Sequence, residues 1–240
     1  GIISGCITAY FLLKKDRRGW ESHMFDLGLV IAFAGIVGGR LWDVFFFDWE
    51  YYHNHLLEIP YIWQGGMAIQ GGIIFACIAA YFYLKKHQIP VLPFADTVTP
   101  GIILGQAIGR IANFMNGDAF GHPTGQDFGL LYPDTTLAYH TYGAQPLWPA
   151  EVWECQGDLL IFVLLLWYGC KTRAEGTTFC LYIMFYSLLR FFLENYRGDY
   201  GTLALGLKSA QLTSLAAFAG AFILFLYFHF KHKSKSGISE

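Results

Sequence analysis

The sequence predicts an all-α, polytopic membrane protein with about seven transmembrane helices and a small extramembrane head after the fourth span. Of the 240 residues, 55% are hydrophobic and only 14% are charged, whereas soluble domains carry about 25% charged residues. Aromatic residues make up 18% of the chain, and many flank apolar runs, where Trp and Tyr sit at the level of lipid headgroups. Basic residues gather at every second connection between the apolar runs.

Seven apolar segments are the candidate spans. A helix needs about 20 residues to cross about 30 Å of hydrocarbon, and most of the segments approach this length. The first begins at Gly1 without a Met and is short, so we expect part of it to lie upstream. We interpret the 240 residues as one transmembrane domain. The segments cover residues 1–13, 25–47, 66–84, 92–112, 148–169, 177–196 and 209–230.

Two connections are predicted to form structure outside the hydrocarbon. Residues 48–65 are aromatic and polar, which is typical of an interfacial segment. Residues 113–147 are rich in Gly, Pro, Asp and Thr, and we expect them to form a head or lid inserted after the fourth span.

The distribution of Lys and Arg predicts the orientation in the membrane. The positive-inside rule assigns connections rich in these residues to the cytoplasm. The N-terminus is then outside, the C-terminus is inside, and residues 48–65 and 113–147 are outside. Four separate basic clusters agree on this orientation: Lys14, Lys15, Arg17 and Arg18; Lys85 and Lys86; Lys171 and Arg173; Lys231, Lys233 and Lys235.

Charge and cysteine usage argue against several classes of partner. The net charge of −2 and the lack of a long basic block argue against nucleic acid. The five cysteines have no CxxC spacing, so neither a zinc site nor a disulfide framework is indicated. His53 and His55 have no third ligand at a fitting spacing. We expect no metal and no cofactor.

Three arginines fall inside or at the edge of predicted spans. An arginine at the centre of a membrane helix costs roughly 2.5–3.5 kcal/mol, so its presence there is a functional hypothesis by default. For Arg40 an internal ion pair with Asp43, three residues later, is an equally good explanation. Arg110 has no acidic residue within one turn, whereas Arg190 has Glu194 at i+4.

Arg110 and Arg190 are the candidates for binding an anion. Both fall in the outer halves of their spans, and Arg197 follows at the outer end of the second. Guanidinium groups bind phosphate in bidentate geometry. We therefore predict that Arg110 and Arg190 face one cavity that binds a phosphate. Gln70 lies among the glycines of residues 65–72. These glycines permit close packing or irregular backbone, and a buried amide needs a polar partner.

The most specific motif is residues 109–121, which read Gly-Arg-Ile-Ala-Asn-Phe-Met-Asn-Gly-Asp-Ala-Phe-Gly. This segment resembles the signature of the prolipoprotein diacylglyceryl transferase family, Gly-Arg-x-Gly/Ala-Asn-Phe-x-Asn-x-Glu-x-x-Gly. Every fixed position matches except the acidic one, where Asp118 replaces Glu. So many matches are not expected by chance.

The resemblance covers essentially the whole chain. Residues 38–40 and 65–72 are similar to family segments in the second and third spans, and Asp96 matches an Asp in the fourth. Pro149 and Glu154 are similar to a His-Pro-x-x-Leu-Tyr-Glu run, and residues 186–197 fit Tyr-x-x-x-Arg-x-x-x-Glu-x-x-Arg. The resemblance implies catalytic arginines at Arg110 and Arg190. We also predict substrate-binding roles for Arg110, Asn113, Asn116, Asp118, Gly121, Gln70, Tyr186, Glu194 and Arg197.

Members of this family transfer the diacylglyceryl group of phosphatidylglycerol to the thiol of a lipobox cysteine in a preprolipoprotein and release glycerol phosphate. The resemblance therefore implies a transferase of lipoprotein biosynthesis in the bacterial inner membrane. Its active site would face the outer leaflet and the periplasm, with a periplasmic head. The partners would be phosphatidylglycerol and a lipobox peptide.

Two family histidines are absent: Gln70 stands for one, and Trp148 stands for the His before Pro149. A family Tyr in the second span appears as Asp43. Glutamine cannot accept a proton, so Gln70 is not a general base, and several alternatives follow for the identity of the base. Either none is needed, or the chain is a paralogue that uses the same lipid with another acceptor, or another group serves. A non-catalytic phospholipid-binding or transport protein is a further alternative. The candidate bases are His122, His140, Asp118 and Glu154.

Overall fold

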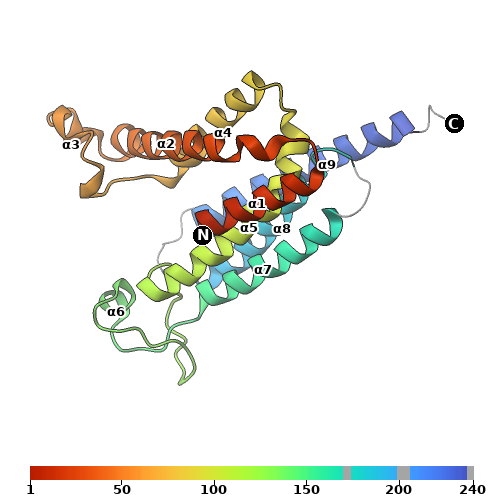
Figure 1. Ribbon diagram of the computed structural model, residues 1–240. Coiled ribbons are helices and arrows are strands. Elements are labelled where there is room, and N and C mark those ends of the chain that lie inside the picture. The colour runs from red at the N-terminus through yellow and green to blue at the C-terminus, as the bar shows by residue number, and fades with distance from the viewer. Residues whose placement is uncertain (170–173, 199–205, 237–240) are drawn as a thin grey trace. The chain divides into compact units, whose positions relative to one another are not determined.

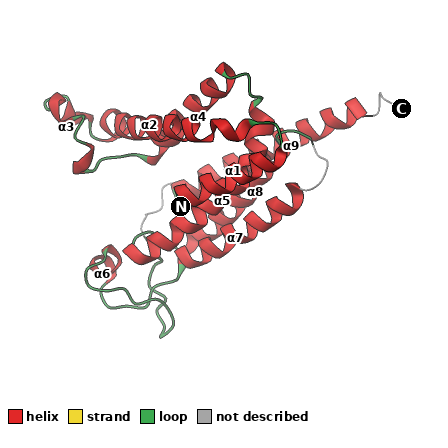
Figure 2. Cartoon of the chain, in the orientation of Figure 1, coloured by secondary structure: helices red, strands yellow, loops and turns green. Residues whose placement is uncertain are grey.

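The computed structural model describes residues 1–169, 174–198 and 206–236, and over these ranges the chain is helical, with isolated β-bridges and no strand (Figure 2). The predicted all-α class is confirmed. Lys171 and Arg173 of the basic clusters lie outside the described residues. Each apolar segment coincides with a helix: α1 (Ile2–Asp16), α2 (Met24–Trp42), α4 (Ile69–Lys86), α5 (Val91–Asn116), α7 (Ala150–Gly169), α8 (Thr177–Leu193) and α9 (Ser209–Ser236).

Several helices are suited to lipid rather than water. In the described part of the chain, four stretches are long and apolar enough to cross a membrane: Trp20–Phe47, Val91–Asn116, Thr177–Tyr196 and Ser209–Lys233. Large apolar side chains such as Phe33 and Ile223 are exposed along them, at 73% and 66%. Contiguous exposed apolar surface of this kind marks contact with lipid or a partner. The chain is therefore a membrane protein.

The chain forms two compact units. One consists of residues 17–94, and the other of residues 1–16 with the chain from residue 95 onward. In the first, α2 packs along α4, and Gly38 faces Gly71 where they cross. A Cβ added at Gly71 would overlap the carbonyl oxygen of Gly38 and the side chain of Trp42. The glycines therefore permit the two backbones to touch, as small residues do in membrane helix pairs.

The segment after α2 is irregular and is held by Arg40. It contains a π-helical turn (Asp43–Phe47), α3 (Trp49–Tyr52) and two short 3₁₀ helices (Leu56–Glu58 and Ile62–Gln64). The Arg40 guanidinium is 4% exposed and donates to four carbonyl oxygens, those of Ile59 at 2.7 Å, Gly65 at 2.8 Å, Gly66 at 3.0 Å and Glu58 at 3.1 Å. Its charge is further compensated by Asp43 at 4.0 Å. Arg40 therefore has a structural role. This agrees with the internal ion pair that was predicted from the sequence as the alternative to an anion site.

The other unit is built around helices α1, α5, α7, α8 and α9, which run side by side (Figure 1). Helices α1 and α5 touch through glycines, because a Cβ at Gly5 would lie 2.7 Å from the carbonyl oxygen of Gly101. Asp96 of α5 caps the start of α8 by accepting hydrogen bonds from the backbone N–H groups of Gly176 at 2.7 Å and Phe179 at 2.9 Å. These contacts fix the frame on which the polar side chains lie.

Residues 117–149 form a lobe between α5 and α7. It contains one short helix, α6 (Leu137–Tyr142), and lies at the end of α5 and the start of α7 (Figure 1). Buried Phe120, Ala138 and Leu147 form its core. The lobe thus has a small apolar core of its own, whereas residues 113–116 of the predicted head belong to α5.

Candidate active site

Three arginines from two helices and a following turn converge on the carboxylate of Glu154 in α7. Arg110 Nη2 of α5 lies 2.7 Å from Oε1, and Arg190 Nη1 of α8 lies 3.3 Å from Oε2. Arg197 follows the 3₁₀ turn η5 (Glu194–Tyr196), and its Nη1 is 3.6 Å from Oε2. Arg110 and Arg190, which are 80 residues apart in sequence, therefore share one carboxylate.

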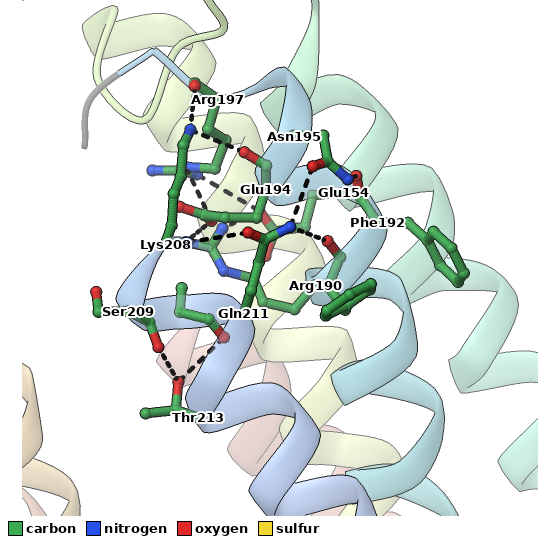
Figure 3. Close-up of polar contacts among 12 residues, drawn as sticks. Glu154, Arg190, Phe192, Glu194, Asn195, Arg197, Lys208, Ser209, Gln211 and Thr213 are labelled. Carbon is green, nitrogen blue, oxygen red and sulfur yellow. Dashed lines mark hydrogen bonds and ion pairs between the residues drawn. The ribbon is translucent and has the colours of Figure 1, made fainter. Parts of the chain in front are cut away.

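Glu194 supplies a second carboxylate to the same group. Its Oε2 lies 2.8 Å from Arg190 Nη2 and 4.0 Å from Arg197 Nε, so the i+4 spacing of Arg190 and Glu194 does give an ion pair. Figure 3 shows these side chains packed at the end of α8. We call the five residues the arginine cluster: Arg110, Glu154, Arg190, Glu194 and Arg197.

The arginine cluster is mostly buried, and its guanidinium groups outnumber its carboxylates by three to two. The side chains of Arg110 and Arg190 are 20% and 14% exposed, against 0–1% for the two glutamates. Charges interact more strongly away from water, so the ion pairs of this cluster are stronger than pairs on an exposed surface. A third carboxyl group, that of Asp158, is buried one turn along α7 and hydrogen-bonds to no described residue.

The signature residues of α5 orient Arg110. Arg110 Nη1 donates to Asn113 Oδ1 at 3.3 Å, and Asn113 Nδ2 donates in turn to Asp118 Oδ1. The backbone N–H of Asp118 also bonds to the carbonyl oxygen of Asn113 at 3.1 Å. Asn113 and Asp118 therefore form a hydrogen-bonded chain that holds the guanidinium group of Arg110.

Gly121 acts through the backbone. It forms an antiparallel bridge with Arg197, and the backbone N–H of His122 donates to the carbonyl oxygen of Tyr196 at 2.9 Å. A Cβ at Gly121 would overlap the carbonyl oxygen of Trp148 on its other side. Glycine is therefore required for the lobe to lie against the chain segment that carries Arg197.

Tyr186 joins the cluster from the preceding turns of α8, where its hydroxyl donates to Glu154 Oε1 at 3.3 Å. Two other predicted site residues are not joined to it by a described contact. Asn116 is exposed at the last position of α5, and Gln70 is exposed in α4 of the other unit. Their roles in substrate binding stay predictions.

Of the four candidate bases, Glu154 is the one that contacts the arginines directly. Its role as the common partner of the arginines was not predicted, because the pairing joins α7 to α5 and α8 rather than residues at a helical spacing. The one sequence signal was the run from Pro149 to Glu154. Asp118 accepts from Asn113, and the Nδ1 atom of His122 lies 2.9 Å from the carbonyl oxygen of Pro123.

The fold and the cluster together define a class of protein: an all-helical membrane protein that retains buried arginines and glutamates among its apolar helices. Such residues are costly to place there, and the cluster is therefore the candidate functional site.

Comparison with known proteins identifies the family. A family model described as prolipoprotein diacylglyceryl transferase matches residues 1–227. Phosphatidylglycerol–prolipoprotein diacylglyceryl transferase of Clostridioides difficile is 35% identical over 243 residues, covering 100% of this chain and 91% of the relative. The proteins of the same name from Staphylococcus saprophyticus and Geobacillus kaustophilus are 35% and 36% identical, over 89% and 88% of this chain and 78% and 80% of theirs. The chain belongs to the prolipoprotein diacylglyceryl transferase family and is a transferase.

Proposed function

We propose that the chain transfers the diacylglyceryl group from phosphatidylglycerol to the lipobox cysteine of preprolipoproteins. The observation that carries this proposal is the convergence of Arg110 and Arg190, both partly accessible, on the single carboxylate of Glu154. The relatives are named for this donor and this class of acceptor.

In this reaction the cysteine thiolate attacks the carbon of the diacylglyceryl group that is bonded to a phosphate oxygen. A C–S bond forms, the C–O bond to phosphate breaks, and glycerol phosphate leaves with one more negative charge than the diester had. Arg110 and Arg190 stabilise this charge as it develops, which is electrostatic stabilisation of a departing anion. Glu154 and Glu194 hold the arginines in place beforehand, so little rearrangement is needed during the step.

The remaining site residues orient the substrates. Tyr186 and Asn113 position the headgroup beside the arginines. The proton of the thiol is lost before or during attack, and the absence of the family histidine at Gln70 means that this residue is not its acceptor.

The proposed setting is the bacterial inner membrane, crossed by seven spans. The arginine cluster opens to the outer leaflet, where phosphatidylglycerol enters from the side, and the lobe of residues 117–149 faces the periplasm and receives the lipobox peptide. The agreement of the four basic clusters on one orientation supports this arrangement.

The test is transfer from labelled phosphatidylglycerol to a synthetic lipobox peptide, followed as a gain of mass on the cysteine. Arg110→Gln and Arg190→Gln should each lower the rate by at least about 100-fold, as removal of one group that stabilises a developing anion does. Arg17→Gln is the matched control, because Arg17 is exposed outside the cluster. Rates equal to the control in both variants would contradict the proposal.

A further inference from the structure

Lys208 is a half-buried cation to which the reaction above gives no role. It immediately precedes α9, and its ammonium group bonds to backbone carbonyl groups of the turn that follows α8. Nζ donates to the backbone carbonyl oxygens of Glu194 at 2.9 Å and Arg197 at 2.6 Å (Figure 3). Both carbonyls belong to residues of the arginine cluster.

Gln211, one turn into α9, reinforces the same connection with both ends of its amide. Its Oε1 accepts from the backbone N–H of Lys208 at 3.0 Å, which caps the start of α9 in the manner of a capping box. Its Nε2 donates to Asn195 Oδ1 at 3.1 Å and to the carbonyl oxygen of Phe191 at 3.3 Å. Gln211 is 3% exposed, so these bonds form away from bulk solvent.

The two side chains thus hold the turn after α8 from one side. The last carbonyl groups of a helix have no partner within the helix and carry partial negative charge. A lysine ammonium group at such a place donates hydrogen bonds to the carbonyl groups and compensates their partial negative charge. Since Glu194 in turn holds Arg190 at 2.8 Å, a shift of this turn would move two guanidinium groups at once.

We propose that Lys208 and Gln211 are positioning residues that set the placement of Arg190 and Arg197 for binding of the phosphatidylglycerol phosphate. Neither residue touches the substrate. The inference rests on the proposed function for the identity of the anion.

The experiment compares Lys208→Met and Gln211→Glu with a matched control. Lys208→Met keeps the length of the side chain and removes its donors. Gln211→Glu keeps an acceptor for the N–H of Lys208 and removes the donor to Phe191 and Asn195. Lys231→Met is the control, because Lys231 is exposed near the other end of the same helix. Two readouts are used: kcat and KM of transfer to the lipobox peptide, and the rise in Tm caused by phosphatidylglycerol relative to phosphatidylcholine.

We expect Lys208→Met to raise KM for phosphatidylglycerol and to lower kcat/KM at least tenfold, with KM for the peptide unchanged, and Gln211→Glu to act in the same direction. The conservative variant Lys208→Arg should keep kcat/KM within about threefold of the wild-type value, because a guanidinium group can donate to both carbonyl oxygens. The Tm rise with phosphatidylglycerol should shrink in Lys208→Met and stay unchanged in Lys231→Met.

A purely structural role would lower Tm in both lipids and reduce activity only in proportion to the folded fraction. That result, or lipid parameters for Lys208→Met within twofold of the Lys231→Met control, would overturn the inference. If the wild-type protein transfers nothing to the peptide, the proposed function fails by itself, and the lipid-dependent Tm rise still decides the role of Lys208.

Discussion

Glu154 is the residue on which the cluster depends, because one buried carboxylate compensates three guanidinium groups. Replacing one partner of a buried ion pair leaves charges without compensation and typically costs about 3–5 kcal/mol. Glu154→Gln keeps the shape of the side chain and removes its charge. We expect the free energy of unfolding to fall by about 3 kcal/mol in a zwitterionic lipid, as measured by denaturant titration.

An anionic lipid should reverse part of this loss. With Glu154 neutral, the excess positive charge of the cluster is larger, so phosphatidylglycerol should stabilise Glu154→Gln more than it stabilises the wild-type protein. Glu175→Gln is the control, since Glu175 is exposed. The interpretation is wrong if Glu154→Gln and Glu175→Gln unfold alike in both lipids.

Arg40 shows why an arginine within a predicted span is not by itself a ligand site. Its spacing to Asp43 suggested an ion pair, and the pair is present at 4.0 Å. The four backbone carbonyls that receive its hydrogen bonds belong to residues 58–66. They approach Arg40 only because the chain folds back after α3, which no local spacing reveals.

At the scale of elements, the α2–α4 crossing depends on two glycines. We expect Gly71→Ala to destabilise the unit of residues 17–94, because the added Cβ would overlap the Gly38 carbonyl and Trp42. Overpacking of this kind costs about 1–3 kcal/mol. The measurement is the Tm of the full chain, together with protease sensitivity of residues 48–66.

Gly28→Ala on the same helix pair is the matched control. A Cβ at Gly28 would meet nothing within 4 Å, and Ala is favoured over Gly in a helix by about 1 kcal/mol. Gly28→Ala should therefore leave Tm unchanged or raise it. Equal loss of stability in the two variants would rule out the close approach as the cause.

For the whole molecule, the sequence predicted the helices and one ion pair of the arginine cluster. Apolar length placed a helix at each of the seven segments, and helical spacing predicted the Arg190–Glu194 pair. The meeting of Arg110, Glu154 and Arg190 could not be read from spacing, because it depends on which faces of α5, α7 and α8 pack together. The same is true of Lys208, whose partners are backbone carbonyls and carry no sequence signal.

The antiparallel bridge between Gly121 and Arg197 has a practical consequence for protein engineering. The lobe connects the end of α5 to the start of α7 (Figure 1) and could be taken for a separable part of the chain. Yet the first residues of the lobe pair with the backbone beside Arg197. The N–H of His122 donates to the carbonyl oxygen of Tyr196 at 2.9 Å, and the N–H of Gly198 donates to the carbonyl oxygen of Phe120 at 3.1 Å. A shortened chain in which residues 119–147 are replaced by a Gly-Ser linker should insert in the membrane with its helices intact. We nonetheless expect its phosphatidylglycerol-dependent rise in Tm to fall to less than half that of the intact protein, because the lobe supports the backbone that carries Arg197.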